Sequence, residues 1–295
     1  MRKKIVIRGA DIGLSKIFDM GAFKAVDADI VSCLDIMLDA EHAREVLEWV
    51  KDRPWISFGW HRHFWWKPVL SPEEVPSLVN EEGRFKWGHK RKDLMAEATY
   101  EDAMKEFEAE LAMCQEITGR YPDASNSDNS DIPFEKAFRD VCRKYGICLN
   151  IEIDKMYVTN PEYIPLDYHM RVINALTDVD LPEGEKKSPF DLGLVETYDP
   201  ADKIIHTDLS KGNSWLISCH PGYLDDLVLA ESRCSIHRVK ELQGYLDPRV
   251  KEWIIENNLE PVNQRDILFG TNEYQEHLKV INSPLWTGNY KSNEL

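Results

Sequence analysis

Several short motifs with well-defined chemistry are missing from the sequence. Its six cysteines are scattered without a C-x-x-C pair, which argues against a zinc site built from thiolates and favours free thiols in a reducing compartment. Neither a G-x-G-x-x-G fingerprint nor a P-loop is present. The sequence therefore offers no support for a nucleotide-dependent enzyme.

Long apolar runs and an excess of positive charge are missing as well. After the basic N-terminus only Ile5-Val6-Ile7 precede Arg8, which is too short a stretch for a signal peptide, and no run approaches the length of a membrane helix. The formal net charge of −16 argues against nucleic acid and anionic membranes as partners. We therefore expect a soluble, cytoplasmic protein.

Short apolar runs alternate with longer helical patterns along the 295 residues. The predicted strands are 4–8, 30–38, 55–60, 121–126, 147–153, 170–174, 214–219 and 259–263, and the predicted helices include 40–51, 100–118, 133–145 and 248–257. Such alternation predicts a parallel sheet in an α/β fold. A single-domain (β/α) barrel, regular or distorted, fits as well as an open doubly wound sheet, and both place functional groups at the carboxyl ends of strands.

Two segments depart from this alternation. Residues 64–92 form an aromatic insertion with three tryptophans and three prolines. Trp65 and its neighbours either line a sugar site, since flat rings suit the apolar faces of sugars, or pack the loop onto the barrel. The C-terminal extension 271–295 is either a loosely held terminus or a tail that docks on a neighbour, so a homo-oligomer stays open.

Polar side chains follow several predicted strands. Asp11 lies in a glycine-flanked turn after the first strand, where an aspartate is either a helix N-cap or a ligand. His61 and His63 follow the third strand and, two residues apart on extended backbone, point the same way. They either share one site, or one is a ligand while the other is held by packing. Asp128 lies in a polar turn after the fourth strand. Together, Asp11, His61 and Asp128 offer two carboxylates and one imidazole, a set that suits Zn²⁺, Mn²⁺ or Mg²⁺.

Other candidates stand near the ends of later strands. His220 ends a buried apolar run and is followed at once by Pro-Gly-Tyr, which places a proton-exchanging side chain in a turn rather than in the core. Tyr223 in the same turn either lines a pocket or packs beneath the turn. Arg171 holds a substrate oxygen or phosphate, or forms a surface ion pair.

Three motifs occur in an order that resembles the YdjC-like (ChbG/HpnK) carbohydrate deacetylases. They are Ala-Asp-Ile-Gly-Leu-Ser at 10–15, Gly-Trp-His at 59–61 and Ser-Cys-His-Pro-Gly-Tyr at 218–223. The segments 80–85, 246–251 and 259–263 fit the family as well, so the resemblance covers nearly the whole chain.

The resemblance implies a distorted (β/α) barrel that binds one divalent metal and removes acetyl groups from N-acetylated sugars. It implies Asp11, His61 and Asp128 as metal ligands, with Asp128 where the family has a histidine. It implies His220 as the proton donor. In the family an aspartate thought to act as the base precedes the metal-binding one, but here that position is Ala10.

The loss of this carboxylate leaves the proton acceptor open. Without a base, removal of a proton from water loses a factor of roughly 10² to 10⁴. Asp35, inside the apolar run of the second strand, either projects into the barrel and takes over with Asp11, or is a solvent-facing residue or ion-pair partner.

The sequence thus predicts a metal-dependent hydrolase acting on a small carbohydrate, with His220, Asp11 and Asp35 as catalytic candidates. His63, Trp65, Arg171 and Tyr223 are the predicted substrate contacts. Two alternatives stay open: a degenerate family member that binds a sugar or a partner without turnover, and another metal-dependent reaction on the same barrel.

Overall fold

The computed structural model describes residues 2–88, 92–126, 130–149, 198–211, 213–232 and 235–290, and the backbone of 168–171. The strands are β1 Lys4–Ile12, β2 Cys33–Ile36, β3 Ser57–Trp60, β4 Ala124–Ser125, β5 Cys148–Leu149, β6 Tyr168–Arg171, β7 Ser214–Cys219 and β8 Glu260–Pro261. The α-helices are α1 Lys16–Asp27, α2 Ala43–Lys51, α3 Tyr100–Thr118, α4 Pro133–Tyr145, α8 Pro200–Ile205, α9 Asp226–Glu231, α10 Ile236–Leu246, α11 Pro248–Glu256, α12 Gln264–Leu268 and α13 Glu273–Val280. Three 3₁₀ helices are η1 Lys92–Glu97, η2 Leu209–Lys211 and η3 Thr287–Asn289.

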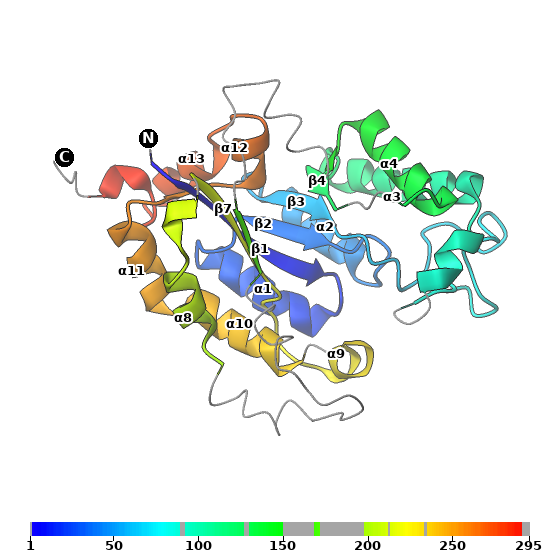
Figure 1. Cartoon of the computed structure of the whole chain (residues 1–295), viewed down its shortest axis with the longest axis horizontal. Coiled ribbons are helices and arrows are strands. Elements are labelled where there is room, and N and C mark those ends of the chain that lie inside the picture. The colour runs from blue at the N-terminus through cyan, green and yellow to red at the C-terminus, as the bar shows by residue number, and fades with distance from the viewer. Residues whose placement is uncertain are drawn as a thin grey trace.

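The described strands join one parallel sheet. Their order is β5-β4-β3-β2-β1-β7-β6, and β8 pairs with the start of β1. The sheet curls and helices surround it, with α8, α10 and α11 along one side and α3 and α4 at the other end (Figure 1). This is the predicted α/β fold in the form of a distorted (β/α) barrel rather than a doubly wound sheet.

Local sequence signals explain where the long helices begin and end. Helix α3 begins after Thr99, whose side chain accepts a hydrogen bond from the Asp102 amide, and ends at Gly119 with a φ of 72°. Helix α4 begins at Pro133 and ends at Gly146, also with a φ of 72°. Glycine adopts this left-handed conformation without the steric cost of a Cβ, so both helices end where the sequence predicts.

The aromatic insertion packs mainly on its own barrel. Phe64, Trp66, Phe85 and Trp87 are buried in the main core, where Phe64 and Trp87 pack against Phe134 of α4. Trp65 is the half-buried exception. The packing alternative therefore applies to Trp66 and Trp87, whereas Trp65 remains near the strand ends.

The C-terminal extension also packs on the same chain. The Tyr274 hydroxyl donates to the carbonyl of Asp29 over 2.9 Å, and the Gln275 side-chain amide donates to the carbonyl of Pro261 over 2.7 Å. Leu278 and Leu285 are buried in the main core. The extension up to residue 290 is therefore part of the barrel's covering layer.

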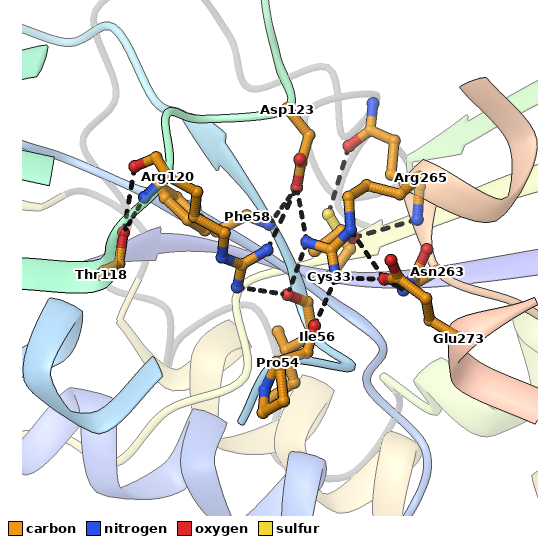
Figure 2. Close-up of polar contacts among 12 residues, drawn as sticks. Cys33, Pro54, Ile56, Phe58, Thr118, Arg120, Asp123, Asn263, Arg265 and Glu273 are labelled. Atoms are coloured by element: carbon orange, nitrogen blue, oxygen red, sulfur yellow. Dashed lines mark hydrogen bonds and ion pairs between the residues drawn. The ribbon is translucent and has the colours of Figure 1, made fainter. Parts of the chain in front are cut away.

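A partly buried ionic network fastens α12, which precedes this segment, to the amino ends of β3 and β4, and Arg265 of α12 also pairs with Glu273 at the start of α13. Figure 2 shows the Asp123 carboxylate between the guanidinium groups of Arg120 and Arg265, at 3.9 Å and 3.3 Å. Asp123 also accepts the amide of Phe58 over 2.9 Å, and both arginines donate to the carbonyl of Ile56. In barrels this end of the strands serves stability, which leaves the opposite, carboxyl end for chemistry.

The five described cysteines are buried and free of disulfides. No helix in the described part of the chain is both long and apolar enough to cross a membrane.

Candidate active site

Asp11 lies at the centre of the carboxyl edge of the sheet. Strand β1 continues through Ile12, so Asp11 belongs to the strand end and not to the turn beyond it. The N-cap of α1 is Ser15, whose hydroxyl accepts the amide of Phe18, and this rules out the capping role for Asp11. Asp11 is 5% exposed and has a φ of 61°. A residue other than glycine in this region is strained, and such strain gathers at functional sites.

Two histidines share one oxygen of Asp11. His61 Nε2 lies 2.7 Å and His63 Nε2 lies 3.1 Å from Asp11 Oδ1. The two rings meet edge to face with centroids 4.2 Å apart. The backbone amide of His61 bonds to the carbonyl of Ile36, which extends the pairing of β3 with β2 to this point. Both histidines therefore serve the same site, one of the two arrangements that their spacing allows.

The other oxygen of Asp11 faces an arginine and a third histidine. Arg238 Nη2 lies 2.6 Å and His220 Nε2 lies 3.9 Å from Asp11 Oδ2. Burial pushes the pKa of Asp11 upward, but the Arg238 guanidinium, His220 and the hydrogen bonds from His61 and His63 together hold it well below its ordinary value. Asp11 is therefore ionised at neutral pH.

Asp35 lies behind His61 rather than beside Asp11. Its Oδ2 atom is 2.9 Å from Arg8 Nη1 and 3.6 Å from His61 Nδ1. The β2–β3 register puts Asp35 opposite Gly59, where an added Cβ would be 2.3 Å from the Asp35 carboxylate. Gly59 thus makes room for a carboxylate that faces the outer nitrogen of His61, the place where histidine ligands usually have a supporting carboxylate.

His63 stacks on Trp65 at the edge of the site. The ring centroids are 3.7 Å apart and the planes differ by 20°. Asp39 holds this segment by accepting the amides of Trp65 and Trp66 over 2.7 Å and 2.9 Å. Burial, with a smaller contribution from His61, lowers the pKa of His63 to about 4. His63 is therefore neutral near pH 7 and keeps a nitrogen lone pair.

His220 is held by a buried glutamate. Glu241 Oε2 lies 3.4 Å from His220 Nδ1 and accepts the backbone amide of His220. Tyr198 donates its hydroxyl to Glu241 Oε1 over 3.2 Å. The imidazole of His220 therefore lies between Glu241 at Nδ1 and Asp11 at Nε2.

The residues Asp11, His61 and His63 suit a divalent cation. One ligand atom from each lies within 4.8 Å of the others. A carboxylate with two imidazoles is a donor set typical of Zn²⁺ and also accepted by Mn²⁺. The site therefore takes its second imidazole from His63, a residue that the sequence predicted as a substrate contact.

Three predicted residues do not enter the described cluster. Asp128 and the side chain of Arg171 lie outside the described residues. The Tyr223 hydroxyl lies 3.4 Å from Lys24 Nζ on α1, and its ring packs against the main core. This position favours the packing alternative for Tyr223.

Sequence reasoning missed Arg8, Arg238 and Glu241. Arg238 and Glu241 are three residues apart on α10, a spacing that puts opposite charges on one helix face. Both are buried, at 2% and 0% exposure. The spacing was visible in the sequence, but nothing in it distinguished this pair from an exposed ion pair.

Comparison with known proteins identifies the family of the chain. Residues 4–256 match the family model described as YdjC-like protein. The chain belongs to the YdjC-like family. The resemblance seen in the motifs is thus confirmed.

Two named relatives match this chain over almost their whole length. Carbohydrate deacetylase 2 of Listeria innocua is 25% identical to this chain, and the alignment covers 90% of this chain and 98% of the relative. A carbohydrate deacetylase of Clostridium beijerinckii is 23% identical, and the alignment covers 90% of this chain and 100% of the relative. Among solved structures, an Enterococcus faecalis protein named for cellobiose-phosphate cleavage aligns with a TM-score of 0.61 at 23% identity, covering 89% of this chain and 98% of that one. This likeness supports the barrel fold.

Proposed function

We propose that this YdjC-like protein is a metal-dependent carbohydrate deacetylase that hydrolyses the acetamide of an N-acetylated sugar. The observation that carries the proposal is the convergence of His61, His63 and His220 on the Asp11 carboxylate at the carboxyl edge of the barrel. The relatives named carbohydrate deacetylase, which match along nearly the full chain, support the same substrate class.

In this proposal Asp11, His61 and His63 would hold the cation. The chemistry that a divalent cation supplies in such a site is polarisation of the carbonyl and a lower pKa of its water. Asp35 holds His61 from behind, which fixes the ring with Nε2 toward Asp11. Asp128 remains a predicted additional ligand.

His220 is the proton donor in this proposal. Its Nε2 atom lies beside Asp11 at the same edge of the barrel, so a sugar acetamide bound over this edge would present its nitrogen to this atom. Proton donation to the departing amine is the step for which histidine is suited near neutral pH.

Asp11 is the described carboxylate best placed to accept a proton from water. Ala10 precedes it where the family pattern has a carboxylate, and Asp35 is engaged with Arg8 on the far side of His61. The pKa of Asp11 is well below its ordinary value, so it is a weak base. We therefore expect slow turnover, reduced by a factor of roughly 10² to 10⁴ relative to a site with a matched base.

Trp65 provides the sugar contact in this proposal. Its half-buried ring is stacked on His63 and held in place by Asp39, so a flat apolar face lies beside the cation ligands. Sugar rings stack on such faces.

A second candidate function is sugar binding without turnover. The loss of the carboxylate at Ala10 favours it, and so does the Arg238 guanidinium, which already neutralises Asp11. In that case the same residues hold the sugar, but no acetate is released.

Acetate release from N-acetylated mono- and disaccharides, measured with Zn²⁺ or Mn²⁺ added, tests the proposal. We expect acetate from the wild type and none from His220→Ala. His206→Ala, an exposed histidine on the C-terminal side of α8, is the matched control and should keep the wild-type rate. Sugar binding by calorimetry with no acetate from the wild type would establish the second candidate instead.

A further inference from the structure

Glu241 is a fully buried carboxylate that the proposed mechanism does not use. It is 0% exposed on α10, and a buried charge is costly unless it is paired and hydrogen-bonded. Its Oε2 atom accepts the backbone amide of His220 and lies 3.4 Å from His220 Nδ1. Its Oε1 atom accepts the Tyr198 hydroxyl over 3.2 Å. Both oxygens are thus engaged, and one is directed at the proposed proton donor.

The same face of α10 serves the two central groups of the site with opposite charges. Arg238 contacts Asp11, and Glu241, three residues later, contacts His220. The His220 ring lies between Glu241 and Asp11. Its Nδ1 atom is directed at Glu241, and its Nε2 atom lies 3.9 Å from Asp11 Oδ2. Helix α10 therefore fixes which nitrogen of His220 faces the site.

We propose that Glu241 is the positioning residue of His220, which keeps the proton on Nδ1 and leaves Nε2 to exchange protons with the substrate. This inference rests on the proposed function. The carboxylate stabilises the imidazolium form, as the buried aspartate does for the histidine of a serine protease. The distance of 3.4 Å is long for a hydrogen bond, and catalytic hydrogen bonds of this kind often tighten only when substrate is bound.

The proton balance follows from this arrangement. Water adds its oxygen to the acetyl carbon and gives up a proton to Asp11. The C–N bond then breaks, and its electron pair takes the Nε2 proton of His220, which releases the free amine. The products are acetic acid, which ionises in solution, and an amino sugar. His220 enters this step as the imidazolium and leaves it neutral, with its remaining proton on Nδ1, facing Glu241. Asp11 then gives its proton to bulk water, and His220 Nε2 takes a proton from water for the next cycle.

Glu241→Gln tests the role of the charge because it preserves the size of the side chain and an oxygen that can accept the His220 amide. We expect kcat for the acetamide to fall at least about tenfold with KM within about twofold, against roughly 10²- to 10⁴-fold for complete loss of proton transfer. Glu241→Asp, which keeps the charge on a shorter side chain, should recover part of kcat. A purely structural role predicts equal loss for both variants.

An activated ester separates proton donation from every other step. The phenolate of 4-nitrophenyl acetate leaves without a proton, so Glu241→Gln should lower the ester rate far less than the acetamide rate. Equal losses on the two substrates would contradict the inference.

The nitrogen resonances of His220 test the inference without any turnover. In ¹⁵N NMR spectra of the wild type we expect the resonances of a His220 ring that carries its proton on Nδ1. In Glu241→Gln we expect these resonances to change, because the charge that favours a proton on Nδ1 is gone. Tyr198→Phe, which removes the hydroxyl on the other oxygen but keeps the charge, should retain the wild-type form. Identical His220 resonances in the wild type and Glu241→Gln would overturn the inference. If the wild type releases no acetate, the proposed function fails, and these spectra still decide the role of Glu241.

Discussion

Arg238 Nη2 lies 2.6 Å from Asp11 Oδ2, so a guanidinium group from α10 neutralises the carboxylate around which the site is built. The two side chains are almost fully buried, and 227 residues separate them in the sequence. The ion pair explains how Asp11 stays ionised in spite of its burial, with its other oxygen directed at His61 and His63.

Arg238→Met should therefore destabilise the metal-free protein. Asp11 would lose its cation inside the barrel, which typically costs about 3–5 kcal/mol. Saturating Zn²⁺ should recover more stability in the variant than in the wild type, because the cation replaces the missing positive charge. Urea unfolding with and without Zn²⁺ measures both effects. Arg249→Met is the control, since this arginine pairs with Asp199 at an exposed site, and such pairs contribute less than about 1 kcal/mol.

Removal of either proposed imidazole ligand should weaken cation binding. We expect one Zn²⁺ or Mn²⁺ per wild-type chain by calorimetry, and a loss of affinity in both His61→Ala and His63→Ala. His206→Ala should bind like the wild type. Wild-type affinity in His63→Ala would remove His63 from the ligand set and favour the predicted ligand Asp128.

Asp35→Asn should affect the same measurement indirectly. The neutral amide would no longer form an ion pair with the buried Arg8 or hold the His61 ring by charge, and loss of such a supporting carboxylate typically costs about 10- to 100-fold in metal affinity. Unchanged affinity would show that the 3.6 Å contact between Asp35 and His61 has no effect on the cation site.

The fold was largely predictable because every described strand lies within or overlaps a segment that the sequence predicts as a strand, and most of these segments are apolar runs that helical periodicity does not explain. Parallel strands bring their carboxyl ends to one edge, which is why Asp11, His61 and His220 could be grouped from the sequence alone. Helix α10 was not predicted. Its inward face carries Arg238 and Glu241, and these charges break the apolar pattern by which helices are recognised.

The partners of the site depend on tertiary packing that the sequence does not reveal. Asp35 was expected to project into the barrel, to face solvent or to form an ion pair. Only the registration of β2 with β1 and with β3 brings it to Arg8 and His61. His63 was assigned to substrate, but Asp39 and Trp65 turn its ring toward Asp11. These roles arise from contacts between segments that are distant in sequence.

The turn at His220 depends on close packing between Gly222 and Phe18. A Cβ at Gly222 would lie 1.8 Å from the Phe18 ring. Gly222→Ala should therefore destabilise the protein by at least the roughly 1–3 kcal/mol typical of overpacking, and should displace His220 and reduce acetate release. Urea unfolding and the acetate assay measure the two effects. The double variant Phe18→Leu with Gly222→Ala removes the opposing ring. Its loss of unfolding free energy should be smaller than the sum of the losses in the two single variants. A loss equal to that sum would count against this contact.

Stability should fall as pH rises because two glutamates are buried together on α3. Glu106 accepts the amides of Val69 and Leu70 over 2.6 Å and 3.1 Å, and Glu110 accepts the indole N–H of Trp60 over 2.7 Å. Burial raises the pKa of both carboxyls, and the neighbouring Glu106 charge raises the pKa of Glu110 further. The two backbone amides that donate to Glu106 favour its charged form. The proton that this buried pair keeps in the folded protein is therefore on Glu110.

Glu110→Gln mimics that protonated state at every pH. Between the ordinary pKa of glutamate and the raised pKa of the folded state, the folded protein holds a proton that the unfolded chain has lost, so wild-type stability declines with rising pH. Glu110→Gln has no proton to lose at this position, so its stability lacks the part of this decline that Glu110 causes. Its stability relative to the wild type should increase from pH 5 to pH 8, by at most roughly 1.4 kcal/mol per pH unit. Urea unfolding across that range measures the difference. Glu116→Gln, on the exposed face of the same helix, is the control, and its stability should depend on pH as that of the wild type does. If the stability of Glu110→Gln also followed the wild type across this range, Glu110 would hold no proton in the folded protein.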